Sequence, residues 1–187
     1  MPRKPEGVTR GLILDQAGQL FLSRGCVGTS VRDIAAACDV SVPALYHYFP
    51  SKDELVSAWC EPFVAASERV VGALDHAAAN ATDGAEFQTL ALELYFDALA
   101  GHESVFRVVS TDRGLRSHPL AGHRLAELAA RYLELLAGPG ADDRLRAVAA
   151  VGAMRLLIRY GTRGGVDRSD LRAQAVASAR AALAAIP

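Results

Sequence analysis

Apolar residues recur along most of the chain at the three- and four-residue spacing of a helix face, and the alternation of a half-buried strand is scarce. This pattern predicts an all-α protein. The first helix is predicted over residues 8–23, where one face carries Ile13, Ala17, Leu20 and Phe21. Gly25 then ends it, as a glycine just beyond a helix commonly does.

Two short helices and a long one are predicted next. Thr29 or Ser30 caps the second helix, and Ser41 caps a third that Pro50 terminates. The sequence Ser-Lys-Asp-Glu is a capping box, and it opens a long fourth helix over residues 51–74.

Five further helices are predicted where glycine, proline and aspartate clusters interrupt the apolar period. They cover residues 84–100, 103–111, 120–137, 142–162 and 169–186. The chain is therefore expected to form a three-helix head over residues 1–50 and a helical body over residues 51–187, which opens with the connector helix 51–74.

Composition narrows the class of protein. The chain has 187 residues, of which 51% are hydrophobic, enough for a sizeable core. Its formal net charge is -1, so nucleic-acid binding must be argued from a local arrangement. Because it begins without a long apolar stretch, we expect a cytoplasmic protein that does not contact a membrane. The three cysteines form no CxxC pair, and we expect buried, reduced thiols, with redox sensing as the alternative.

Residues 29–49 contain the most informative pattern, two short helices across a tight turn. Leu45 and Phe49 supply the buried face of the second helix. The opposite face carries only small or hydrogen-bonding side chains, which can enter a DNA major groove. They are Ser41, Val42, Pro43, Ala44, Tyr46 and His47.

Three consecutive segments, LFLSRG, TSVRDIAAACDVSVPALYHYF and SKDEL, resemble the TetR (tetracycline-repressor-like) family in order and spacing. The resemblance covers roughly residues 9–56. Asp39 stands in the turn where the family usually has glycine, and aspartate tolerates a left-handed conformation better than most residues. The family's common Tyr-Tyr-His-Phe order appears as Tyr46-His47-Tyr48-Phe49. The second departure affects the assignment of individual DNA contacts.

The resemblance implies that the protein binds double-stranded operator DNA. Ser41, Val42, Pro43, Ala44 and His47 would face the groove, with Arg32 reaching it from the preceding helix. Tyr46 and Lys52 would hold phosphates.

Of these side chains, Arg32 has the geometry for a bidentate contact with guanine. The alternatives are a solvated or acid-paired Arg32 and a Tyr46 that packs in the core. Arg3, Lys4 and Arg10 could follow the DNA backbone or minor groove, or form a solubilising tail.

One head offers too small a surface for tight specific binding, so we expect a homodimer with two recognition helices on a two-fold axis. The last two predicted helices carry apolar stripes suited to this interface, although both stripes could instead pack into the protomer's own core. The first stripe contains Leu145, Ala149, Gly152, Leu156 and Tyr160. The second contains Leu171, Ala175, Ala179, Leu183 and Ile186.

In the family the body encloses a ligand pocket, and ligand binding changes the affinity for DNA through the connector helix. The candidate ligand-binding residues are Trp59, Phe63, Phe87, Tyr95, Phe106, Arg107, Tyr132, Met154 and Arg155, with His102 and His123 as further polar groups. Aromatic residues at helical spacing are equally consistent with a packed core. The set suggests an unidentified small-molecule effector that is apolar or amphipathic with one acidic group.

No motif of an enzyme or a cofactor site occurs in the sequence. It lacks HExxH, a nucleophile elbow and a glycine-rich phosphate loop. We therefore expect a regulator, most simply a repressor that ligand releases, that is neither an enzyme nor dependent on a cofactor or metal. The competing hypothesis is a helical adaptor or chaperone-like protein whose head binds protein instead of DNA.

Overall fold

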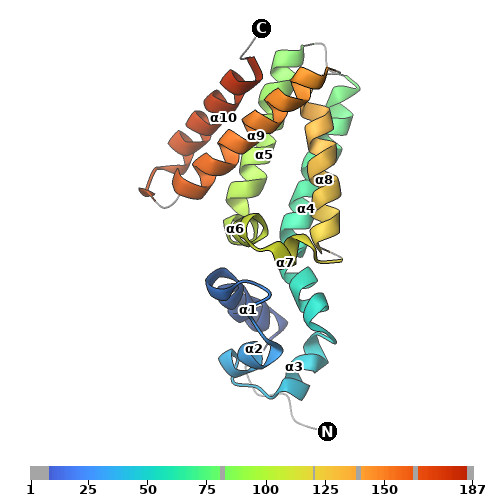
Figure 1. The fold of residues 1–187 in the computed structure, drawn as a ribbon, viewed down its shortest axis with the longest axis vertical. Coiled ribbons are helices and arrows are strands. Elements are labelled where there is room, and N and C mark those ends of the chain that lie inside the picture. Colours follow the sequence, from blue (N-terminus) through green and yellow to red (C-terminus); the bar gives the residue numbers. More distant parts are fainter. Residues whose placement is uncertain (1–8, 81–82, 120, 138–139, 162–163, 185–187) are drawn as a thin grey trace. The chain divides into compact units, whose positions relative to one another are not determined.

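The computed structural model describes residues 9–80, 83–119, 121–137, 140–161 and 164–184. Within these ranges the chain forms ten helices and no strand (Figure 1), which confirms the all-α prediction. Their bounds are α1 Arg10–Arg24, α2 Val31–Ala37, α3 Val42–Tyr48, α4 Lys52–Ala78, α5 Gly84–Gly101, α6 Glu103–Thr111, α7 Arg113–Arg116, α8 Ala121–Leu136, α9 Ala141–Gly161 and α10 Arg168–Ala184.

Two elements differ from the sequence prediction. Helix α4 continues four residues beyond the predicted end, because its alanine-rich last turn contains no helix breaker. Helix α7 was not predicted, because four residues are too few to show an apolar period. The described body therefore has six helices after the connector where five were expected.

The chain divides into two compact units. The first contains Met1–Val64 and Ser104–Leu125, and the second contains Ala65–Glu103 and Ala126–Pro187. Helices α4 and α8 each contribute to both units, and α7 packs with the head. A functional border between residues 50 and 51 stays a prediction.

The first unit has its own core, which positions the helix-turn-helix. Its fully buried side chains are Ile13, Phe21, Ile34, Leu45, Phe49, Leu55 and Leu115. The Trp59 ring on α4 meets the Phe21 ring on α1 edge-on, with centroids 5.2 Å apart. A β-carbon at Gly18 would come within 2.5 Å of the Trp59 indole nitrogen, so glycine allows α4 to approach α1 this closely.

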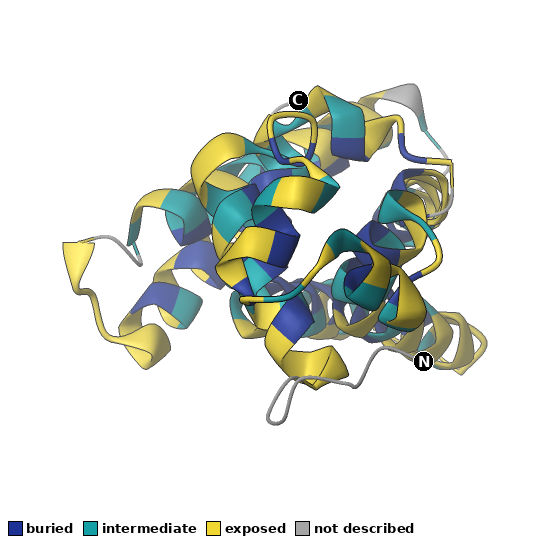
Figure 2. Ribbon diagram, turned by 90° about the horizontal axis from the view of Figure 1, so that it is seen from below, coloured by how far each residue is buried: buried dark blue, intermediate teal, exposed yellow. Residues whose placement is uncertain are grey.

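In the second unit, α9 and α10 lie side by side and α5 packs against both. The shared core contains Leu92, Phe96, Ala147, Met154, Ile158, Leu171, Ala175 and Ala179. Arg172 on α10 ties this layer to α5 through Glu93 at 3.3 Å and Asp97 at 3.2 Å. In Figure 2 buried residues gather on the inner faces of the helices and exposed residues on the outer faces. None of the described helices has the length and apolarity needed to span a membrane.

All three cysteines are buried and free, as expected. Burial raises the pKa of Cys26 to about 12, with the nearby Asp112 carboxylate adding to the shift. Burial likewise raises the pKa of Cys60 to about 12. Since the thiolate is the reactive form, these thiols are poor nucleophiles at neutral pH.

Candidate nucleic-acid interface

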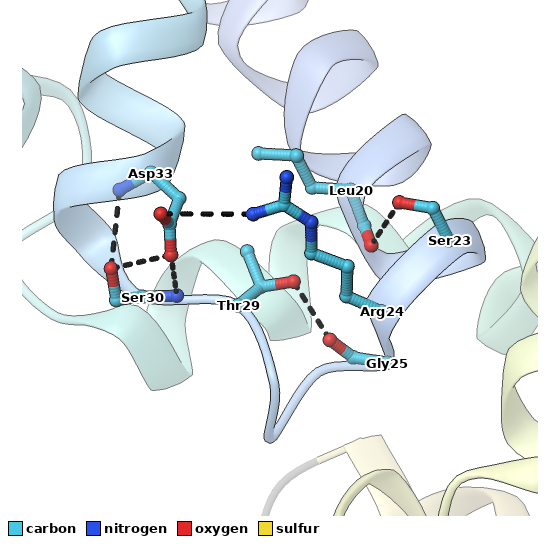
Figure 3. A network of polar contacts seen from close by, with 7 residues as sticks. All are labelled: Leu20, Ser23, Arg24, Gly25, Thr29, Ser30 and Asp33. Carbon is cyan, nitrogen blue, oxygen red and sulfur yellow. Dashed lines mark hydrogen bonds and ion pairs between the residues drawn. The ribbon is translucent and has the colours of Figure 1, made fainter.

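Helix α2 begins with a complete capping box (Figure 3). The Asp33 amide donates to Ser30 Oγ at 3.1 Å, and the Ser30 amide donates to Asp33 Oδ2 at 2.8 Å. The Ser30 hydroxyl also donates to Asp33 Oδ2 at 2.6 Å. These hydrogen bonds from Ser30 are the main reason that the pKa of Asp33 is lowered. Ser30 is thus the cap, which settles the choice between Thr29 and Ser30.

The loop that precedes α2 is fixed to the end of α1. The buried Thr29 hydroxyl donates to the Gly25 carbonyl at 2.8 Å, and the Arg24 guanidinium lies 3.8 Å from Asp33 Oδ1 (Figure 3). Gly25 has a φ of 76°, in the left-handed region that favours glycine. The loop therefore holds α2 in a defined position relative to α1.

The turn between α2 and α3 depends on Asp39, whose φ of 52° confirms the predicted left-handed conformation. The Asp39 amide donates to the Ala36 carbonyl at 3.2 Å, and the Val40 amide donates to the Ala35 carbonyl at 2.9 Å. This pair of hydrogen bonds is a Schellman motif, which closes a helix end tightly. Aspartate thus takes the left-handed position where the family that the sequence resembles usually has glycine.

Helix α3 presents one polar face and buries the other. The Ala44 amide donates to Ser41 Oγ at 3.3 Å, so Ser41 caps the helix as predicted and its hydroxyl proton remains available to donate. Leu45 and Phe49 are each 1% exposed. Ser41, Pro43, Tyr46 and His47 are exposed, and Val42 and Ala44 are half-buried.

Arg32 and Tyr46 are accessible. Within the described part of the chain the exposed Arg32 has no ion-pair or hydrogen-bond partner, so it is not committed to a neighbouring acid. Tyr46 is 44% exposed, which excludes the alternative that it packs in the core.

Lys52 is half-buried and donates from Nζ to the Cys26 carbonyl at 2.5 Å. Two of its three ammonium protons remain for another acceptor.

Of the three basic residues near the N-terminus, Arg10 is the one that the structure describes. Arg10 is the first residue of α1, and its guanidinium carbon lies 4.7 Å from the centroid of the Phe49 ring, in a cation–π contact. This contact holds the Arg10 side chain against the buried Phe49 ring of the head. Arg3 and Lys4 lie outside the described residues.

The predicted ligand-binding residues fall into both units. Trp59, Phe63, Phe106 and Arg107 belong to the first unit, and Phe87, Tyr95, Tyr132, Met154 and Arg155 to the second. His123 belongs to the first unit and His102 to the second. Trp59 packs against the head through Phe21.

In the second unit the structure brings three of these residues together. The Tyr95 and Tyr132 rings stack with centroids 4.4 Å apart, and Arg155 Nε donates to the Tyr95 hydroxyl at 2.7 Å. The Tyr132 hydroxyl donates to the Ala91 carbonyl at 2.9 Å. Burial raises the pKa of both tyrosines, so both hydroxyls stay protonated at neutral pH. We call these three residues the tyrosine–arginine cluster.

The two apolar stripes differ in exposure. On α9 the side chains of Leu145, Leu156 and Tyr160 are 70%, 56% and 59% exposed, Ala149 is exposed, and Gly152 has open space around it. On α10 the exposure of three residues favours the alternative of packing into the protomer's own core. Leu171, Ala175 and Ala179 are at most 5% exposed because α10 turns this face toward α9 and α5, so they leave no surface for a partner. Leu183 is half-buried, and Ile186 lies outside the described residues.

Comparison with known proteins identifies the head. The family model "Bacterial regulatory proteins, tetR family" matches residues 13–59. The transcriptional activator FasR of Mycolicibacterium smegmatis is 30% identical over 107 residues, which cover 57% of this chain and 48% of FasR. The transcriptional repressor KstR2 of Mycobacterium tuberculosis is 40% identical over 55 residues, 29% of this chain and 28% of KstR2. The chain thus spans about half or less of the length of these curated relatives.

The fold comparison extends over the body. The crystal structure of the TetR-family regulator PfmR from Thermus thermophilus matches 94% of this chain and 98% of PfmR, with a TM-score of 0.68 and 26% sequence identity. The helix-turn-helix head, its capped turn and the helical body together match a family of regulators, not of enzymes. Residues 13–59 thus belong to the TetR family of helix-turn-helix transcriptional regulators, and the whole described chain has the fold of a solved TetR-family regulator.

Proposed function

We propose that the protein is a ligand-responsive repressor that binds a palindromic operator as a homodimer and is released by a small apolar or amphipathic ligand. The DNA-binding part of this proposal rests on the accessible face of α3. Arg32 lies on the preceding helix and has no partner within the described residues, and the head matches the TetR family model. Repression is proposed because KstR2, which matches at 40% identity in this head, is a repressor, although FasR is an activator.

Base reading is assigned to Arg32 and to the α3 face formed by Ser41, Val42, Pro43, Ala44 and His47. Arg32 supplies the bidentate donor pair, whereas Val42, Pro43 and Ala44 offer apolar surface for thymine methyl groups. Tyr46 and Lys52 would hold phosphates, which fix the register of the head without reading sequence. With few base hydrogen bonds available, operator preference should also depend on DNA shape.

Arg32→Ala is expected to cost about 1–3 kcal/mol of operator binding and to relax the preference at one base pair. Lys52→Ala should weaken binding to all sequences alike and lower the salt slope by about 1, because it removes a phosphate contact. Fluorescence anisotropy titrations on operator and scrambled DNA across a salt series measure both effects.

Lys52 also hydrogen-bonds the Cys26 carbonyl, so each variant's thermal unfolding should be measured to confirm that titrations are made on folded protein. Equal, sequence-independent losses from both variants would contradict the assignment.

The dimer is assigned to the exposed stripe of α9, formed by Leu145, Val148, Ala149, Gly152, Leu156 and Tyr160. Large apolar side chains that are more than half exposed on one helix face are characteristic of an uncovered interface. Gly152 at the middle of the stripe would let a partner helix approach closely. A two-fold symmetric dimer would read two half-sites about 34 Å apart, one with each recognition helix.

The effector site is assigned to the tyrosine–arginine cluster. Both rings are buried in the core of the second unit and would pack against the apolar body of a bound ligand. The Arg155 guanidinium uses Nε for Tyr95 and retains its terminal amino groups for an acidic group of that ligand. This chemistry fits an amphipathic molecule with an apolar body and one carboxylate or phosphate. KstR2, whose solved structure matches 97% of this chain at 20% identity and a TM-score of 0.73, is described as a ketosteroid transcriptional regulator. The fold is also similar to that of FadR from Bacillus subtilis, which was solved in complex with stearoyl-CoA, at 17% identity and a TM-score of 0.61. Ketosteroids, fatty acids and their coenzyme A thioesters therefore form the first screening panel.

Tyr95→Phe is expected to reduce the effector's influence on operator affinity while leaving DNA binding without effector unchanged. The substitution keeps the buried ring and removes the hydroxyl that accepts from Arg155. In wild type, effector and operator should alter each other's affinity by the same factor, equivalent to about 1–3 kcal/mol. Operator titrations with and without the panel compound that raises the melting temperature most measure this coupling.

Tyr132→Phe is the matched control, because it removes a hydroxyl that bonds the Ala91 carbonyl and not Arg155. If both variants lose only stability and keep full coupling, the cluster is core and not an effector site.

Selection of bound fragments from the source genome by the purified protein tests the function as a whole. A recovered palindrome supports the proposal, and the neighbouring genes indicate the effector class. Failure to enrich any sequence, with binding equal on all DNA, would exclude an operator-specific regulator and favour the adaptor hypothesis.

A further inference from the structure

Asp112, between α6 and α7, was not singled out by the sequence and makes contacts in two directions. Its Oδ1 accepts from the Gly114 amide at 2.7 Å and from the Leu115 amide at 3.2 Å, which caps α7. Its Oδ2 accepts from the amide of Cys26, a residue 86 positions earlier in the chain. One carboxylate thus joins the start of α7 to the loop between α1 and α2.

The loop is held on its other side by α4. Lys52 donates to the carbonyl of Cys26, while Asp112 accepts from the amide of the same residue, so both backbone polar groups of Cys26 have side-chain partners. Because Lys52 and Asp112 are both charged, each of the two hydrogen bonds is charge-assisted and stronger than a neutral one. Beyond α7, His118 Nε2 lies 3.4 Å from Asp53 Oδ1 at the first turn of α4.

Glycines permit the close approach at this point. A β-carbon at Gly25 would lie 2.7 Å from Asp112 Oδ2, in addition to the strain of its positive φ. A β-carbon at Gly114 would overlap Cγ2 of Val27. The positions of the loop and of α7 are therefore mutually dependent.

The same loop determines where α2 begins, since Thr29 and Gly25 are hydrogen-bonded across it and Ser30 caps α2. Helix α7 follows α6. The chain passes from the second unit to the first between Glu103 and Ser104, at the start of α6. A displacement of α7 would therefore be transmitted to the helix-turn-helix through the carboxylate of Asp112.

We infer that Asp112 is a positioning residue for DNA binding: its carboxylate couples the start of α7 to the loop that sets the orientation of α2 and α3. The inference rests on the proposed operator binding. Asp112 is not one of the residues proposed to contact DNA. Its role is to control how well those residues fit the operator.

Asp112→Asn separates the two contacts. The asparagine side-chain oxygen can still cap α7. Its NH2 group would then point at the Cys26 N–H, and because both groups are donors, the hydrogen bond to Cys26 is lost. We expect operator affinity to fall by about 5- to 20-fold, within the usual range of coupling between sites, while the melting temperature falls less than in Asp112→Ala. Asp83→Asn is the matched control, because Asp83 likewise caps a helix, α5, through the Ala85 and Glu86 amides and belongs to the second unit.

Amide hydrogen exchange gives a readout that is independent of DNA. The Cys26 amide should exchange faster in Asp112→Asn than in wild type, while amides in the middle of α1 keep their protection. Unchanged exchange at Cys26 would show that the contact does not exist in solution and would overturn the inference.

A reversible cross-link tests the positioning role directly. A β-carbon at position 114 would lie 3.6 Å from Cβ of Val27, a separation suited to a disulfide. In the Asp112→Asn background, Val27→Cys with Gly114→Cys should bind the operator weakly when reduced and regain most of the wild-type affinity when oxidised. The native thiols of Cys26 and Cys60, whose pKa burial raises to about 12, should oxidise more slowly, and peptide mapping verifies the bridge.

The outcomes distinguish this inference from the proposed function. Restored affinity on oxidation supports positioning, because a loss caused by unfolding would not depend on the redox state of one cross-link. Wild-type affinity in Asp112→Asn, or no gain on oxidation, would overturn the inference while leaving operator binding intact. If wild type itself binds no operator, the proposed function fails and this inference fails with it.

Discussion

Gly152→Glu is expected to convert the homodimer into a folded monomer and to abolish operator binding. A β-carbon at Gly152 would have no neighbour within 4 Å in the described residues apart from its own helix backbone, so the glutamate should be solvated there and leave the fold unaffected. In the proposed dimer the same position lies at the centre of the interface, between Leu145 and Leu156. An unpaired charge buried there would cost roughly 3–5 kcal/mol, a change in the dimer dissociation constant of about 10²- to 4 × 10³-fold.

Sedimentation velocity at micromolar concentration measures this change, and operator titration should show the loss of binding in parallel. Gly72→Glu is the matched control, because Gly72 on α4 also has open space around it and lies outside the α9 stripe. The control should remain dimeric and bind DNA. A wild-type monomer, or a dimeric Gly152→Glu variant, would contradict the α9 interface.

Ala179→Glu is expected to unfold the second unit instead of dissociating the dimer. Ala179 on α10 is 0% exposed and faces the core shared with α9 and α5. A carboxylate at this position would lose its hydration without gaining a partner, a cost of several kcal/mol that is comparable to the whole stability of about 5–15 kcal/mol of a typical domain.

Chemical denaturation followed by circular dichroism measures the loss. Ala173→Glu, an exposed alanine on the same helix, should leave the midpoint nearly unchanged. A folded but monomeric Ala179→Glu variant would instead show that α10 reorients in the dimer.

Local chemistry could be predicted from sequence because it depends on residues close together in the chain. The cap at Ser41, the end of α1 at Gly25 and the left-handed Asp39 each involve hydrogen bonds or backbone angles within about one helical turn. The same holds for the face of α3, since a helix of known phase that buries Leu45 must expose Tyr46 and His47. The order of these short-range features also carried the resemblance to the TetR family.

Which apolar stripe is core and which is surface could not be predicted in this way. The stripes of α9 and α10 have similar composition, and the helical period shows only that each helix has an apolar face. The structure buries Leu171, Ala175 and Ala179 because that face of α10 meets α9 and α5, and it leaves Leu145 and Leu156 exposed. Which helix covers a given apolar face depends on packing between helices that are far apart in sequence.

The sequence by itself determined the all-α fold, the helix-turn-helix and its exposed face. Only the tertiary structure decided that Trp59 packs against Phe21, that Tyr95 and Tyr132 stack beside Arg155, and that Asp112 contacts Cys26. The physical reason is the range of the interactions: caps, turns and amphipathic faces are set within a few residues, whereas these contacts join residues 37 to 86 positions apart, with no sequence period to connect them.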